Sequence, residues 1–170
     1  SDVSKNEDQT LSDVEKSLRF MTDVLRNEDD WVPETIDRIL YEDGGVLAEE
    51  DGQPLGDGLN ALRETGLNGQ EVYRQLLNKV FNVGDSSGLN IVDIEGADGE
   101  IGLRAEGTDR YFGVINIGGD KVFLDRIEGE YENISVESDQ FKSSLFNTIN
   151  EQDSDINVLM GSRKFIEGWD

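Results

Sequence analysis

The spacing of apolar residues changes near Gly84, and this change limits the possible folds more than any other feature of the sequence. Ahead of Gly84, apolar residues recur at helical spacing, as they do on one face of an amphipathic helix. After Gly84, short apolar runs are separated by glycine-bearing turns, which is typical of strands. We therefore expect a mixed α/β fold, with a mainly helical region over residues 1–84 and an α/β unit over residues 85–170.

Two helices are expected at the start of the helical region. The first begins after an N-cap at Thr10 and carries its apolar stripe as far as Leu25, while the polar residues ahead of it are expected to fray. The second starts near Pro33, because proline suits the first helical turn, and it ends before residues 43–45.

The rest of the helical region is expected to hold an acidic loop and two further helices. A loop or hairpin is expected over residues 49–57, which are acidic, bear glycine and contain Pro54. A short helix is expected over residues 59–64. Asn68, with Glu71 three residues later, predicts the capped start of the last helix.

The second region is expected to alternate strands with helices. Strands are expected over residues 89–94, 101–105, 111–117, 134–136 and 156–160, and helices over residues 122–127 and 141–149. Gly107-Thr108-Asp109 predicts a hairpin turn between the second and third strands. The last strand is an almost unbroken apolar run, which predicts that both of its faces are covered.

The chain is strongly acidic, with 15 Lys+Arg against 38 Asp+Glu and a net charge of −23. Such a charge repels nucleic acid at low salt, so it indicates either a surface for a basic partner or adaptation to molar salt. The carboxylates are spread along the whole chain and lysines are few, which favours adaptation to salt. On that interpretation, net charge says little about function.

Histidine and cysteine are both absent. Their absence excludes disulfides, thiolate chemistry, a Ser-His triad and the commonest metal ligand, so we expect no metal site within the chain. No apolar run is long enough for a membrane helix and no signal peptide is visible, so we expect no membrane partner and a cytoplasmic location.

Three glycine-bearing loops are weak candidates for a site. The acidic loop at Asp51 lacks oxygen ligands at alternate positions, because Gln53 and Leu55 occupy them, so it does not match a calcium loop. The glycines at 96, 99 and 102 do not match the dinucleotide fingerprint and predict a turn. Gly118-Gly119 can present backbone N–H groups to a phosphate, but a tight turn explains it better.

The last residues combine several features that point to a ligand. An apolar strand ends at Gly161-Ser162, and Gly168 and Asp170 flank Trp169 shortly after. Strand ends are where α/β sheets present ligands, and a small residue followed by a hydroxyl lets a phosphate approach the backbone. An ordinary loop after a core strand explains the same residues equally well.

The stretch VLMGSRKFIEGWD, residues 158–170, resembles motif V of superfamily 2 helicases, in which a strand leads to a small residue, Ser/Thr and then Gly-x-Asp. GSRKFIEGWD in particular is similar to the helicase subunit of type III restriction enzymes and related DEAD/DEAH-type proteins. Residues 96–104, 111–118 and 144–150 are similar to stretches of the same family.

The resemblance implies that residues 85–170 are part of the second RecA-like domain of a helicase, ending at motif V. It implies that Ser162 contacts the nucleic acid backbone, and that Gly168 and Asp170 lie at the interdomain cleft that binds ATP. The parent protein would use ATP and Mg²⁺, act on duplex DNA and pair with a methyltransferase subunit. Glu167 stands where arginine is commoner, so no arginine contact is carried over at that position.

The chain contains no phosphate loop of the form G-x-x-x-x-G-K-[ST] and no DEAD/DEAH-like tetrad. We therefore expect no catalytic residues in it, and neither ATP hydrolysis nor DNA unwinding by the chain alone, although it can self-associate through exposed apolar surface. The alternative function is that of a standalone acidic interaction protein, such as a DNA mimic that acts on restriction enzymes. A structural domain with a chance motif match ranks last.

Overall fold

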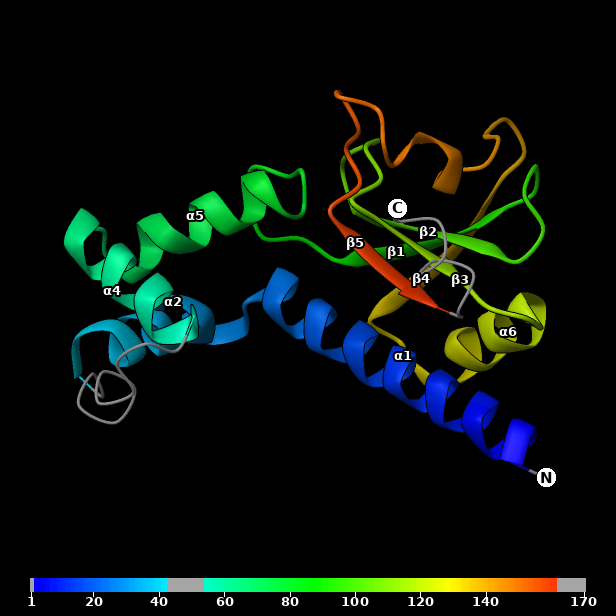
Figure 1. The fold of residues 1–170 in the computed structure, drawn as a ribbon, viewed down its shortest axis with the longest axis horizontal. Helices are drawn as coiled ribbons and strands as arrows, with labels where there is room; N and C mark the ends of the chain where they lie inside the picture. The colour runs from blue at the N-terminus through cyan, green and yellow to red at the C-terminus, as the bar shows by residue number, and fades with distance from the viewer. Residues whose placement is uncertain (1, 43–53, 162–170) are drawn as a thin grey trace.

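The computed structural model describes residues 2–42 and 54–161 and has a mixed α/β fold, with most helices in the N-terminal half (Figure 1). The α-helices are α1 (Asp2–Arg26), α2 (Trp31–Asp37), α4 (Pro54–Thr65), α5 (Gly69–Lys79) and α6 (Asp120–Glu130). The shorter helical turns are η1 (Glu28–Asp30), η2 (Arg38–Glu42) and η3 (Phe146–Thr148). The strands are β1 (Leu89–Ile94), β2 (Glu100–Ala105), β3 (Gly113–Asn116), β4 (Ile134–Asp139) and β5 (Val158–Gly161).

The five strands form one mixed sheet in the order β4-β1-β2-β3-β5. β1, β2 and β3 make an antiparallel meander, whereas β4 pairs in parallel with β1, and β5 in parallel with β3. Four strands therefore run in one direction and only β2 opposes them. Their ends, at Ile94, Asn116, Asp139 and Gly161, lie along one side of the sheet, which we call the carboxyl edge.

One face of the sheet is covered by helices. Alternate residues of the strands, such as Ile91, Leu103 and Ile115, are fully buried in a cluster with α1, α6 and the end of α5. An ion pair between Arg126 and Glu15 joins α6 to α1 at 3.1 Å. Because α1 belongs to the N-terminal half, the two halves of the chain share this core.

The opposite face is covered by the irregular segment that links β4 to β5. Leu145 is buried in this segment, against Val92, Ile94, Tyr111 and Val114. The contact requires a glycine in β2, because a Cβ at Gly102 would lie 2.6 Å from the Tyr111 ring and 3.1 Å from Leu145.

The remaining helices, α2, α4 and α5, extend to one side of the sheet (Figure 1). α2 and α5 cross closely at Gly69, whose N–H donates to the Asp37 carboxylate at 2.6 Å. A Cβ on Gly69 would lie 2.1 Å from the Pro33 carbonyl oxygen, so only glycine permits this approach.

Most predicted elements are confirmed. All five predicted strands are present, and so are the helix after Gly118-Gly119 and the helix that starts near Pro33. Asn68 caps α5, since its side chain accepts from the Glu71 N–H at 2.9 Å. The hairpin turn between β2 and β3 contains Gly107 with φ of 90°, a conformation that favours glycine. A domain boundary near residue 84 stays a prediction.

Two helix boundaries in the first region are wrong. α1 begins at Asp2, not after Thr10, because residues 2–10 contain no glycine or proline to stop the helix from extending toward the N-terminus. α4 begins at Pro54, so residues 54–57 are helical where a loop was expected, with proline in the first turn. The rest of that expected loop, residues 49–53, and the proposed helix stop at 43–45 lie outside the described residues.

One prediction for the second region also fails. The expected helix over residues 141–149 is only the short 3-10 turn η3, because the Glu100 carboxylate, 45 positions away, takes the backbone N–H of Leu145. The last strand was expected to be covered on both faces. β5 lies at the edge of the described sheet and is half-buried, with Val158 and Met160 packed against the core on one face and Leu159 against the core on the other.

Candidate functional site

The three residues predicted to contact ligands, Ser162, Gly168 and Asp170, lie outside the described residues. The strand that leads to them is described: β5 pairs in parallel with β3 and ends at Gly161. Gly161 has φ of 147°, a conformation that favours glycine. The chain thus reaches Ser162 from the carboxyl edge of the sheet.

The carboxyl edge also brings the Gly118-Gly119 loop close to this point. Asn116, at the end of β3, is the register partner of Gly161. Gly119 has φ of 69° and precedes α6, whose first residue, Asp120, is only 8% exposed. Because a buried carboxylate at a helix N-terminus opposes anion binding, the loop acts as a tight turn and not as a phosphate cradle.

The four stretches that resemble the helicase family gather on one side of the sheet. Residues 96–104 form β2 and the turn before it, and residues 111–118 contain β3, the antiparallel neighbour of β2. β5, which starts the motif V resemblance, pairs with the other side of β3. Residues 144–150 cover the face formed by these strands through Leu145, so the described parts of the four stretches are adjacent although they are separated in sequence.

Glu100 holds the covering segment in place. Its side chain is 4% exposed, and its carboxylate accepts from the Ser144 hydroxyl at 2.5 Å and from the Leu145 N–H at 2.8 Å. Both partners belong to residues 144–150, so two of the family-like stretches are joined directly. A buried carboxylate with two donors fixes a backbone position more firmly than an apolar contact does.

A polar network on the same face was missed from the sequence. Arg104 of β2 forms an ion pair with Glu137 of β4 at 2.5 Å, and its guanidinium lies 5.3 Å from the centre of the Tyr111 ring. The Tyr111 hydroxyl donates to the Asp139 carboxylate at 2.8 Å. These partners are 28 and 33 positions apart, so no local pattern indicates their pairing.

This network shifts the pKa of several of its members, Tyr111 and Asp139 among them. Burial and the hydrogen bond to Asp139 together raise the pKa of the Tyr111 hydroxyl. Burial opposes ionisation of Asp139, but the hydrogen bonds that its carboxylate accepts from Tyr111, Phe141 and Lys142 outweigh it and lower its pKa. Asp139 is therefore a carboxylate that the fold keeps ionised.

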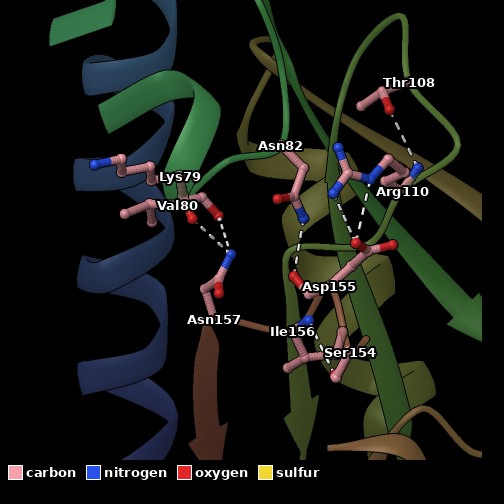
Figure 2. Close-up of polar contacts among 9 residues, drawn as sticks. All are labelled: Lys79, Val80, Asn82, Thr108, Arg110, Ser154, Asp155, Ile156 and Asn157. Carbon is pink, nitrogen blue, oxygen red and sulfur yellow. Dashed lines mark hydrogen bonds and ion pairs between the residues drawn. The ribbon is translucent and has the colours of Figure 1, made fainter. Parts of the chain in front are cut away.

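The segment that enters β5 is fixed to both halves of the chain (Figure 2). The Asn157 side chain donates to the carbonyl oxygens of Lys79 and Val80, at the end of α5, over 2.9 and 3.0 Å. The Asn82 side chain donates to the Asp155 carbonyl oxygen at 2.8 Å, and the Asp155 carboxylate pairs with Arg110 at 2.7 Å. The position of β5 is thus tied to the end of the helical region.

An open pocket of 380 Å³ lies beside α6 and β4 at the carboxyl edge. Its polar lining includes Asp93, Lys121 and Asp125. Burial, followed by the negative charge of Asp120, raises the pKa of Asp93, while Lys121 partly offsets the shift. A pocket with this excess of carboxylates repels anions.

The grouping of the described carboxylates bears on metal binding. None of the described carboxylates belongs to a group of three or more that could hold a metal ion. No phosphate loop occurs in the sequence, and the pocket at the carboxyl edge is acidic.

No match to this chain was found among protein-family models, curated proteins or solved structures. No helix in the described part of the chain is long and apolar enough to cross a membrane.

Proposed function

We propose that this chain is part of the helicase or translocase subunit of a type III restriction-modification system, in the cytoplasm, and that it lies in the second RecA-like domain. The observation that carries the proposal is the adjacency of the four family-like stretches around β2, β3 and β5. The pairing of β5 with β3 brings two of these stretches together although α6 and β4 lie between them in the sequence.

Within this proposal, motif V links two sites of the parent protein. Ser162 contacts the nucleic acid backbone, and Gly168 and Asp170 lie at the cleft that binds ATP with Mg²⁺. Support comes from β5, the strand that leads to motif V, because it pairs with β3 and the residue before it, Asn157, binds the end of α5. The chain supplies one corner of the nucleotide site and is inactive alone.

A standalone acidic protein that imitates DNA is the second candidate, and the net charge of −23 favours it. This candidate predicts a basic protein partner, whereas the helicase proposal predicts duplex DNA and a methyltransferase subunit. The alternative leaves the adjacency of the family-like stretches unexplained.

The proposal is tested by substituting Asp170→Ala in the intact subunit and measuring ATP hydrolysis with and without duplex DNA. We expect the DNA-stimulated rate to fall by about tenfold or more, because a contact at the interdomain cleft aligns the groups that act on ATP. Ser162→Ala is expected to weaken DNA binding.

Asp153→Ala is the matched control, because Asp153 is an exposed carboxylate ahead of β5. This variant should hydrolyse ATP like the unaltered subunit. Equal DNA stimulation in the Asp170 and Asp153 variants would contradict the proposed role of motif V.

A further inference from the structure

β4 is an edge strand, and one side of its backbone is open. It pairs in parallel with β1, and the order β4-β1-β2-β3-β5 places it at the end of the sheet. Within the part of the chain that the structure describes, no segment forms hydrogen bonds with its outer side. An edge strand of this kind presents a row of N–H and C=O groups that another strand can bind.

The pocket beside α6 opens along this edge. Its lining includes Val136, Glu137 and Ser138, which are consecutive residues of β4. Consecutive side chains of a strand point to opposite faces, so a pocket lined by all three reaches around the edge of the strand. Because β1 occupies the inner edge, the pocket lies along the outer one. We call this pocket the β4 groove.

One side of α6 forms the other wall of the β4 groove. Lys121, Asp125 and Glu128 line it at spacings of four and three residues, which places them on one side of the helix. Leu124 and Val136 also line it and add apolar surface. A groove between an open strand edge and a helix fits an extended peptide, which adds to the sheet as a further strand.

The β4 groove is negatively charged. Its lining holds a single cation, Lys121, and four carboxylates: Asp93, Asp125, Glu128 and Glu137. Among the described residues, only Glu137 of these four has an ion-pair partner, which is Arg104 at 2.5 Å. Burial and the neighbouring charge of Asp120 raise the pKa of Asp93, so a cation placed beside Asp93 is favourable.

These charges decide which kind of strand can pair with β4. A second copy of this chain is disfavoured, because β4 carries Glu137 and Asp139, and like charges on paired strands are destabilising. A neutral strand does not offset the cost of removing the carboxylates from water. A strand with lysine or arginine forms ion pairs in addition to backbone hydrogen bonds, and the stems of these side chains can cover Leu124 and Val136.

We propose that the β4 groove binds an extended segment of a partner protein that is rich in lysine and arginine. The backbone of this segment pairs with the outer edge of β4, and its basic side chains lie against Asp93, Asp125 and Glu128. This interface goes beyond the proposed function, because it depends only on β1, β4 and α6 and holds whether or not the chain belongs to a helicase.

The test is binding of a fluorescent peptide of about seven residues, in which arginine alternates with threonine and valine, to the full chain. Anisotropy is measured from about 1 M KCl down to the lowest concentration at which circular dichroism shows a folded chain. We expect binding that tightens as KCl falls. A matched peptide with N-methyl groups on alternate backbone amides keeps the charge but cannot pair as a strand. It should bind about tenfold more weakly, because several backbone hydrogen bonds are lost.

Two double variants locate the contact at the lowest of these KCl concentrations. Asp125→Asn with Glu128→Gln should weaken binding of the unmodified peptide by roughly tenfold, because two ion pairs are lost. Glu34→Gln with Glu64→Gln is the matched control, because it removes the same charge from exposed positions on α2 and α4. This control should bind like the unaltered chain. Bound peptide should also slow hydrogen exchange at residues 134–139.

Three results would overturn the inference: no binding of the peptide, equal binding of the N-methylated peptide, or equal weakening in the two double variants. The last two would show a general attraction of cations to an acidic chain. Self-association of the chain that the peptide disrupts, with slow exchange at residues 134–139 already present in the free dimer, would assign the edge to a second copy and would also overturn the inference.

Discussion

Asp93 is held at the carboxyl edge in an environment that disfavours its charge. It is partly buried at the end of β1, it lines the pocket beside α6, and the negative charge of Asp120 acts on it. Both effects raise its pKa above the ordinary value of 3.8, with Lys121 acting in the opposite direction. The folded state therefore binds the proton of Asp93 more tightly than the unfolded state does, and ionisation of this group destabilises the fold.

Asp93→Asn is accordingly expected to stabilise the protein at about pH 7, where Asp93 is ionised in both states. The gain should shrink as pH falls through the raised pKa and disappear below 3.8, where the group is protonated in both states. The measurement is the urea midpoint of unfolding as a function of pH. Asp109→Asn, which removes the same charge from an exposed turn, should show no such dependence.

Residue-level predictions from the sequence succeed where the partner is local. The cap at Asn68 involves a residue only three positions away, so the sequence pattern reveals it. Tyr111 and Asp139 are 28 positions apart, and their pairing depends on the parallel register between β1 and β4. No single-sequence pattern encodes that register.

At the scale of elements, the segment before β5 connects the helical region to the sheet. The Asn157 side chain donates hydrogen bonds to the carbonyl oxygens of Lys79 and Val80. These carbonyl groups lie at the end of α5, where no further helical turn follows to supply N–H donors. Asn157 also precedes β5 directly, and its N–H donates to the Phe112 carbonyl oxygen at 2.7 Å. One residue thus ends α5 and starts β5 (Figure 2).

Asn157→Ala should therefore lower the free energy of unfolding by about 1 kcal/mol, because the side-chain hydrogen bonds are lost while water partly replaces them. Asn147→Ala is the matched control, since Asn147 is exposed and lies in η3. Chemical denaturation of both variants measures the difference. Equal stability of the two variants would show that the contact to α5 contributes nothing.

Element types were predictable where the spacing of apolar residues is regular. The strands β1, β2 and β3 alternate or run apolar between glycine turns, and they appear where they were expected. The segment between β4 and β5 has helical spacing at Phe141, Leu145 and Ile149 but is not helical. The Leu145 N–H donates to the carboxylate of Glu100, which is 45 positions away, so a tertiary contact overrides the local spacing.

At the scale of the whole molecule, the net charge of −23 is the dominant property. Only a few of the carboxylates in the described residues form ion pairs, such as Glu15 with Arg126. The remaining charges repel one another over a distance set by the salt, about 10 Å at 0.1 M and about 3 Å at 1 M. Dilute buffer therefore destabilises the compact state.

Circular dichroism over a KCl series should show a folded chain at molar KCl and an expanded or unfolded chain at ~0.1 M. The same series with sucrose in place of KCl controls for effects that do not depend on charge. Full folding in dilute buffer would contradict adaptation to salt and would favour the acidic interaction protein.

The candidate ligand site could be predicted from the sequence only in part. The resemblance indicates Ser162, Gly168 and Asp170 from a continuous stretch, because motif V is local in sequence. The adjacency of the four family-like stretches required the sheet order, in which β5 returns beside β3 across the molecule from β4. Contacts of this kind depend on topology and not on local pattern.

The most direct test of the central claim is the coding sequence on both sides of this chain in its source. If the chain is part of a helicase subunit, one open reading frame carries a phosphate loop of the form G-x-x-x-x-G-K-[ST] upstream and an arginine-rich motif downstream of Asp170. A frame that holds neither motif and stops directly after Asp170 would contradict the claim, and the acidic interaction protein would then become the better account.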